Sequence, residues 1–187
     1  MPLSKPLPRD HIHTREIKCL GFKRADGLWD IEGSIIDTKT YSFENEDREG
    51  VASGEPVHHM IIRVTMDDNL IIHNAEASTI SAPYSICPSI TPAFEKLKGE
   101  QIGPGWRNRV MTLLGKTAGC THLRDLLIGP VAVTAYQSIV PRKKDNEYEP
   151  KRSKSPALLN TCIAFSDKGP IVKKRWPKYY LGKQKSQ

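Results

Sequence analysis

Apolar and polar residues alternate along two segments near the start of the chain, residues 15–24 and 28–37. Such alternation is typical of β-strands that have one buried face. Between the segments lies Asp26-Gly27, a dipeptide that favours tight hairpin turns. In the second segment one face would carry mainly apolar side chains, namely Trp29, Ile31, Gly33 and Ile35. The pattern therefore predicts an antiparallel hairpin.

A second hairpin is predicted from residues 58–66 and 70–78, which flank the polar turn Asp67-Asp68-Asn69. Apolar and polar residues alternate here too, from Met60 onward. The intervening residues 39–56 are polar and read as a loop or partial strand. Four antiparallel strands are enough to build one sheet with a covered face.

The second half of the chain contains residues that typically begin and end helices. Thr91-Pro92 is typical of a helix start, and Gly99 is a suitable residue to end that helix. A second helix is predicted over residues 106–114. A third begins at Thr121 and should be kinked or interrupted at Gly129-Pro130, because proline lacks the backbone N–H that a helix needs.

Strands followed by helices predict an α+β fold, with the helices packed on one face of an antiparallel sheet made from two N-terminal hairpins. Residues 158–165 alternate again, and we expect a last strand there. The single domain is predicted to span residues 14–165. A proline-rich, disordered lead-in (residues 1–13) precedes it, and a basic tail (residues 166–187) follows.

The composition of the 187 residues, 38% hydrophobic and 26% charged, is that of a globular domain. No apolar run approaches the roughly 20 residues that cross a bilayer. The first residues also lack the apolar stretch of an export signal. We therefore expect a cytoplasmic protein with reduced thiols and no membrane partner.

The net charge of +7 is unevenly distributed. Residues 142–187 hold thirteen Lys/Arg and four Asp/Glu, a balance of +9, which leaves −2 for residues 1–141. Such a segment could bind an acidic partner or nucleic acid through phosphate contacts. It could equally be a solvated tail. Because no nucleic-acid motif is recognised, nucleic acid is not the expected partner, and an interaction module remains a further alternative.

Candidate chemistry lies at the ends of the predicted elements. His58 opens the third strand, Cys87 follows the fourth, and Cys120 and His122 lie where the third helix begins. In an antiparallel hairpin, the start of one strand and the end of the next lie side by side. His58 and Cys87 can therefore be neighbours in space. If the third helix begins at that end too, Cys120 and His122 complete a group of sulfur and nitrogen donors that could bind a metal. Thiolate and imidazole ligands favour zinc or iron.

Other roles for these residues remain open. Without metal, Cys120 could act as a nucleophile with His122 or His58 as base, in a lyase or hydrolase for a small-molecule substrate. Tyr84 is a further catalytic candidate, and Asp26 and Asp30 are polar candidates that also fit turn and sheet-edge roles. Two thiols in alternating patterns, Cys19 and Cys162, are expected to be small core residues.

The chain resembles a bacterial family catalogued as a domain of unknown function, DUF2889. The segments that carry the resemblance are HTREI (13–17), RADGLWDIEGSIIDTK (24–39), GEPVHHM (54–60), APYSIC (82–87), LKGEQIGPGW (97–106) and AGCTHL (118–123). They cover nearly all of the chain before the basic segment. The family has no established activity, so this resemblance implies no function.

From Gly54 onward the chain is also distantly similar to NifU/IscU-type iron–sulfur scaffolds. The likeness follows the order of ligand, strand, turn, strand, cysteine, helix ending in Lys98-Gly99, and a final cysteine that opens a helix. It implies that His58, Cys87 and Cys120 fall where the scaffolds have their three cysteines, and His59 near their aspartate. In this chain an imidazole replaces the first thiolate, and Gly119 replaces the histidine that precedes the third cysteine.

The combined prediction is a metal-binding protein of scaffold-like fold. Zinc or iron would be held by His58, Cys87 and Cys120, with His122 or a water molecule as the fourth ligand. No nucleotide cofactor is expected, because Gly103-Pro104-Gly105 breaks a helix and is not a phosphate-binding loop. The sequence leaves the oligomeric state and the substrate open.

Overall fold

The computed structural model describes residues 3–142, 156 and 158–182. The chain divides into two compact units, residues 1–142 and 143–187, and each is treated by itself below. Residues 158–165, predicted from the sequence to end the first domain, thus fall in the second unit. Much of the basic segment, residues 143–155, 157 and 183–187, lies outside the described residues.

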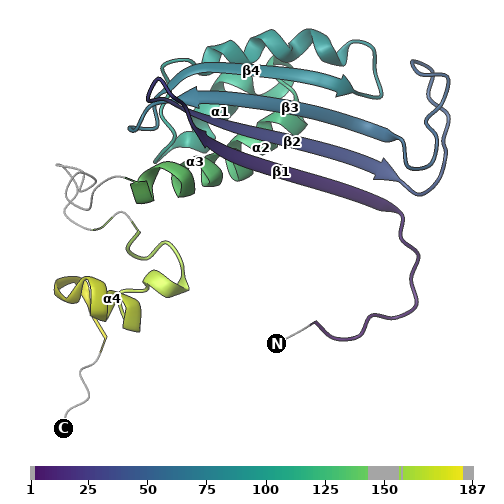
Figure 1. Ribbon diagram of the computed structural model, residues 1–187. Helices are drawn as coiled ribbons and strands as arrows, with labels where there is room; N and C mark the ends of the chain where they lie inside the picture. The colour runs from purple at the N-terminus through teal and green to yellow at the C-terminus, as the bar shows by residue number, and fades with distance from the viewer. Residues whose placement is uncertain (1–2, 143–155, 157, 183–187) are drawn as a thin grey trace. The chain divides into compact units, whose positions relative to one another are not determined.

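The first unit contains a four-stranded antiparallel sheet in the order β1-β2-β3-β4 (Figure 1). The strands are β1 (His13–Lys23), β2 (Trp29–Lys39), β3 (Pro56–Met66) and β4 (Ile72–Ser81). Both predicted hairpins are therefore confirmed. Gly27 has a φ angle of +87°, a left-handed conformation that glycine adopts without steric cost, and this explains the tight turn after β1.

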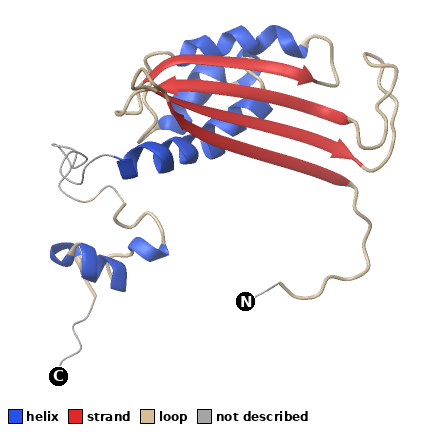
Figure 2. Ribbon diagram, in the orientation of Figure 1, coloured by secondary structure: helices blue, strands red, loops and turns tan. Residues whose placement is uncertain are grey.

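The helical segments of the first unit lie on one face of this sheet, so the predicted α+β class is confirmed (Figure 1, Figure 2). They are η1 (Cys87–Leu97), α1 (Trp106–Leu114), η2 (Lys116–Ala118), α2 (Thr121–Leu126), η3 (Leu127–Val131), α3 (Ala132–Ile139) and η4 (Val140–Arg142). None of the described helices is long and apolar enough to cross a membrane.

The prediction of an α-helix starting at Thr91-Pro92 was wrong in type and in boundary. Residues Cys87–Leu97 form a 3₁₀ helix. Pro92 has no N–H to donate to the carbonyl of Pro88, as an α-helix would require. The hydroxyl of Thr91 donates to that carbonyl instead, at 3.0 Å. The carbonyl of Pro88 therefore keeps a partner although Pro92 has no N–H.

The third predicted helix is interrupted at the expected place. α2 and α3 are separated by the single π-helical turn η3, which contains Pro130. The indole N–H of Trp106 donates to the carbonyl of Leu127 at 2.8 Å, a buried bond that ties α1 to this turn. The missing donor of proline explains the widened turn, and Trp106 satisfies a carbonyl within it.

The core lies between the sheet and the helical layer. Along β2 every second side chain is buried, beginning at Trp29, as the alternation predicted. The largest fully buried side chains come from both layers, and include Ile31, Ile35, Met60, Ile62, Met66, Ile72, Phe94, Leu97, Leu114, Leu123, Leu126 and Leu127. Helix packing therefore fixes which face of each strand is buried.

The described part of the second unit contains η5 (Ile163–Phe165), α4 (Pro170–Arg175) and η6 (Pro177–Tyr179). The predicted strand over residues 158–165 was wrong, and Cys162 is exposed rather than a core residue. Asn160 has a φ angle of +59°, and its side chain bonds Asp167 at 2.9 and 3.0 Å. These local polar bonds favour a turn over an extended strand.

Candidate metal centre

A row of three polar side chains crosses the sheet on the face that the helices cover. Asp37 of β2 pairs with Arg15 of β1 on one side and with His58 of β3 on the other. Asp37 follows Ile35 in the same alternation, so it continues the core-facing side of β2. The β2–β3 register shifts next to Asp37, and such irregularities redirect side chains at functional sites.

The Asp37 carboxylate is buried and accepts two hydrogen bonds from Arg15. Arg15 Nε donates to Oδ1 at 2.7 Å, and Nη2 donates to Oδ2 at 2.8 Å. The carboxylate side chain is only 3% exposed, whereas that of Arg15 is 40% exposed. Paired hydrogen bonds of this kind fix the orientation of both planar groups.

Three imidazoles surround the same carboxylate. His58 Nδ1 lies 3.1 Å from Asp37 Oδ2, and His13 Nε2 lies 3.2 Å from Oδ1. His122, in the first turn of α2, brings its Nε2 to 3.9 Å from Oδ2. The rings of His58 and His122 are tilted against each other with centroids 4.0 Å apart. The expected meeting of β3 and the start of α2 is therefore present for these two residues.

Burial and neighbouring charges lower the pKa values of both inner histidines. Burial lowers the pKa of His58, and the nearby His122 lowers it further, against the opposing effect of Asp37. Burial also lowers the pKa of His122, and the charge of Arg15 adds to that effect. Both imidazoles are therefore neutral at neutral pH, the form in which histidine binds metals.

The pKa of the Asp37 carboxyl is also lowered. Burial by itself raises that pKa, but the hydrogen bond and the charge of Arg15 outweigh burial, with smaller help from His58 and His13. The pKa of Arg15 is raised in return, chiefly by its hydrogen bond to Asp37. The site therefore holds a firmly ionised carboxylate beside two neutral imidazoles.

Among the described residues, Asp37, His58 and His122 each bring one potential ligand atom within 4.8 Å of the others. Two of the predicted ligands, His58 and His122, belong to this group. Sequence reasoning missed Asp37. The alternation that begins at Trp29 continues to Asp37, and it predicts that this acidic side chain faces the core.

The thiols lie outside this group. Cys120 immediately precedes α2, with its Sγ 3.9 Å from Nδ1 of His122 and 3.6 Å from Sδ of Met60. Cys87 begins η1, where its backbone N–H donates to the carbonyl of the exposed Tyr84. The structure thus places Cys120 beside a candidate ligand, Cys87 at the start of η1, and Tyr84 in the connection between β4 and η1.

The remaining polar candidates serve the sheet and its turns. Asp26 pairs with Arg24 in the first hairpin turn, at 2.7 Å. Asp30 accepts a 2.6 Å hydrogen bond from the hydroxyl of Thr65. Asp30 lies seven residues before Asp37 on β2, about 23 Å along an extended strand. Its role is therefore at the other end of the sheet.

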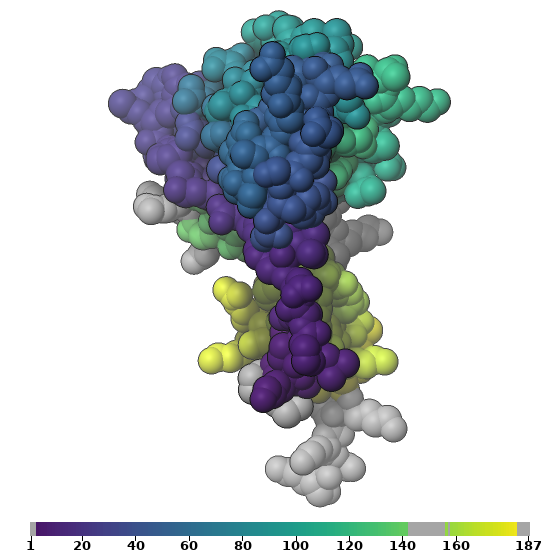
Figure 3. All heavy atoms as spheres, turned by 90° about the vertical axis from the view of Figure 1, so that its right-hand side faces the viewer, coloured from purple at the N-terminus to yellow at the C-terminus, as the bar shows by residue number. Residues whose placement is uncertain are grey.

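The end of the sheet that carries the cluster faces the reader in Figure 3, where the connection between β2 and β3 occupies the centre in blue. This is the end where β1 and β3 begin and where β2 stops (Figure 1). The side chains of His58 and His122 are 19% and 22% exposed. A solute can therefore reach the imidazoles while the carboxylate stays buried.

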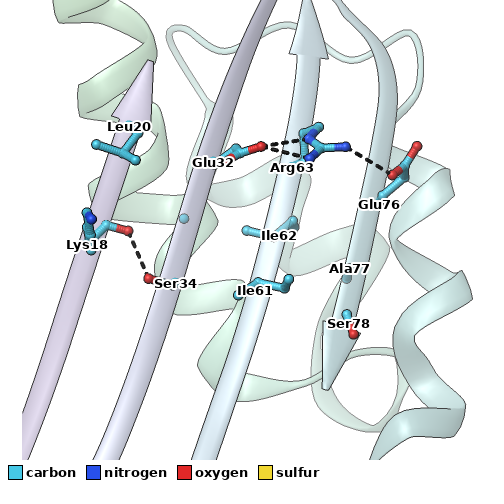
Figure 4. Close-up of a pocket in the computed structure, with 11 residues that line it drawn as sticks. Lys18, Leu20, Glu32, Ser34, Ile61, Ile62, Arg63, Glu76, Ala77 and Ser78 are labelled. Carbon is cyan, nitrogen blue, oxygen red and sulfur yellow. Dashed lines mark hydrogen bonds and ion pairs between the residues drawn. The ribbon is translucent and has the colours of Figure 1, made fainter. Parts of the chain in front are cut away.

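A separate hollow of about 390 Å³ lies on the opposite, open face of the sheet (Figure 4). Ser34, Ile61 and Ala77 are among the residues that line it. Among the charged residues that line it, Arg63 bonds Glu32 at 2.8 Å and approaches Glu76 at 3.8 Å. The hollow lacks the histidines and the buried carboxylate that make the other face chemically distinctive.

Fold and site together define an α+β protein with a buried aspartate–histidine cluster at one end of its sheet. The family model for proteins of unknown function, DUF2889, matches residues 13–137. The chain belongs to this family, as its sequence resemblance predicted. No curated protein and no solved structure matches the chain, so the likeness to NifU/IscU-type scaffolds finds no support and stays a prediction.

Proposed function

We propose that this protein binds a single divalent transition metal, zinc or iron, through Asp37, His58 and His122. The observation that carries the proposal is the convergence of three ligand atoms from β2, β3 and α2 within 4.8 Å. Donors bound to one metal at about 2.1 Å lie roughly 3.0–3.4 Å apart. The separations of 3.1 and 3.9 Å from Asp37 Oδ2 therefore require only small side-chain movements.

The type of donor supports a mononuclear centre. Two imidazoles and one carboxylate suit zinc in catalytic sites and also suit non-haem iron. An iron–sulfur cluster would be held by thiolates, and the group contains no thiol. Three protein ligands leave coordination positions open for water or substrate. A metal-dependent lyase or hydrolase acting on a small organic molecule is the corresponding activity.

Cys120 has a supporting role in this proposal. If His122 binds the metal through Nε2, its Nδ1 carries the proton and faces Cys120 Sγ at 3.9 Å. Cys120 can in turn donate to Met60 Sδ at 3.6 Å. Partners of this kind hold a ligating imidazole in one orientation and one tautomer. Cys120 is therefore assigned to positioning His122.

A second candidate function uses no metal. The thiol of Cys120, the imidazole of His122 and the carboxylate of Asp37 follow one another in space, with both separations at 3.9 Å. This is the order of nucleophile, base and orienting acid in cysteine enzymes. It predicts that iodoacetamide alkylates Cys120 faster than the exposed Cys162, and that His122→Gln removes the difference.

The metal proposal is tested by elemental analysis of protein expressed in medium supplemented with zinc and iron. We expect about one metal per chain in the wild type, and its loss in Asp37→Asn, His58→Gln and His122→Gln. The matched control is His59→Gln, because His59 is the next residue on β3 and points to the opposite face of the sheet.

Retained metal in the Asp37, His58 and His122 variants, or a metal-free wild type, would overturn the proposal. The cysteines provide a further test of the ligand set. Cys87→Ser is expected to leave the metal content unchanged, and Cys120→Ser to weaken binding without abolishing it. Complete loss of metal in both cysteine variants would instead support the thiolate ligands predicted from the sequence.

A further inference from the structure

The proposed metal centre has an unusual balance of charge. One buried carboxylate, Asp37, is approached by Arg15 and by three histidines. The negative charge of Asp37 is therefore already matched by the guanidinium before any metal is present. The other acid that acts on the site is Asp125 of α2, which is exposed and influences Arg15 and His122 only through space.

A divalent ion would add two positive charges to this arrangement. Asp37 is held by Arg15, and His58 and His122 bind metal as neutral imidazoles, so these groups offer no further negative charge. Uncompensated charge in a largely buried site is costly. Neutral water molecules in the open positions would not offset that charge, whereas an anionic ligand would.

Arg15 can help to bind such an anion. A guanidinium has five N–H donors, and the two bonds to Asp37 use two of them. The side chain is 40% exposed, so a solute can approach it. Arginine pairs preferentially with planar oxyanions such as carboxylates, to which it can donate two parallel hydrogen bonds.

We propose that the metal binds together with the carboxylate group of a small organic acid, which occupies an open coordination position and pairs with Arg15. This inference rests on the proposed metal site and names the substrate class for it. Because binding free energies are reciprocal, a carboxylate must tighten metal binding by the same factor as the metal tightens carboxylate binding. The metal alone should therefore bind more weakly than its three ligands would suggest.

The experiment measures the dissociation constant for Co²⁺ by visible absorption, at pH 7.5 and constant ionic strength. The reference medium contains sodium perchlorate, and the comparison medium contains sodium acetate with free Co²⁺ corrected for its acetate complex. We expect acetate to tighten binding about tenfold in the wild type, within the usual range of coupling between sites. We also expect the absorption bands of bound Co²⁺ to change. Sodium phosphate, as a third medium, separates carboxylate from inorganic oxyanion binding.

Arg15→Gln tests the assigned partner. Without the guanidinium, Asp37 is free to neutralise the metal, so Co²⁺ should bind at least as tightly in perchlorate as in the wild type. The effect of acetate should fall below about twofold. The matched control is Lys18→Gln, which removes a positive charge from the same strand on the opposite face and should keep the full effect. Arg15→Lys, which keeps the charge, should retain part of it.

If the wild type binds Co²⁺ with equal affinity in perchlorate and in acetate, this inference is overturned. That comparison uses the wild-type protein alone. A full acetate effect in Arg15→Gln would also contradict it, as would phosphate acting more strongly than acetate. If the wild type binds no Co²⁺ in any medium, it is the proposed metal site that fails. The two failures are therefore distinguishable.

Discussion

The substitution Asp37→Asn should destabilise the metal-free protein, because it removes the charge on which the cluster depends. Asparagine has nearly the same shape, so packing is preserved. Its carbonyl oxygen can keep one hydrogen bond from Arg15, but its amide N–H₂ then faces another donor of that guanidinium. The variant therefore loses one charge-assisted bond and leaves a buried polar group poorly paired.

The expected cost is about 2 kcal/mol, since a hydrogen bond to a charged group contributes roughly 1.5–3 kcal/mol and Arg15 is partly solvated. For a domain of this size that corresponds to a fall in Tm of about 4–8 °C. The assay is thermal unfolding followed by circular dichroism, with a chelator present so that bound metal does not contribute. Glu32→Gln is the control, because the exposed pair between Glu32 and Arg63 should contribute less than about 1 kcal/mol.

The loss of stability caused by Asp37→Asn should also depend on pH in a defined direction. The folded-state pKa of Asp37 lies below its ordinary value, so its contribution is complete above that value and is lost as pH falls through the folded-state pKa. The difference in stability between wild type and Asp37→Asn should thus be constant near neutrality and shrink below about pH 4. A Tm loss no larger than that of Glu32→Gln would refute the reasoning.

Other consequences are equally specific. The pKa values of His58 and His122 are lowered on folding, so the unfolded chain takes up protons first as the pH falls. The urea midpoint of the metal-free protein should therefore decrease as pH drops below about 6.5. The same pH dependence of the urea midpoint in the double variant His58→Gln/His122→Gln would contradict this. Gly33→Ala should cost about 1–3 kcal/mol of unfolding free energy, since its Cβ would lie 2.7 Å from Val131 Cγ2. Gly103→Ala, with open space around the new Cβ, should be nearly neutral in the same urea titration.

Much of the sheet could be predicted because its determinants are local. Alternation set the buried face of β2, and Asp26-Gly27 set the first turn. A hairpin centred on that turn pairs Lys23 with Trp29 and, further out, Arg15 with Asp37. The ion pair at the heart of the site was therefore accessible from the sequence, once an acid at a core-facing position is treated as a signal.

Other features depend on contacts between distant segments. The pairing of Asp37 with His58 crosses the connection between β2 and β3, whose length leaves the register undetermined. The position of His122 depends on how α2 packs against the sheet. Sequence reasoning placed the cysteines at the site because they lie at predicted element ends near His58 and align with the cysteines of the iron–sulfur scaffolds. It could not show that the buried Asp37 carboxylate lies beside both His58 and His122.

The most direct test of the metal proposal is X-ray absorption spectroscopy of the purified protein at the zinc and iron edges. We predict one metal surrounded by nitrogen and oxygen donors at about 2.0–2.2 Å, with the scattering pattern of two imidazoles. A sulfur shell near 2.3 Å would contradict the Asp37, His58 and His122 ligand set and would support coordination by the cysteines. The absence of either metal edge would contradict the metal site itself.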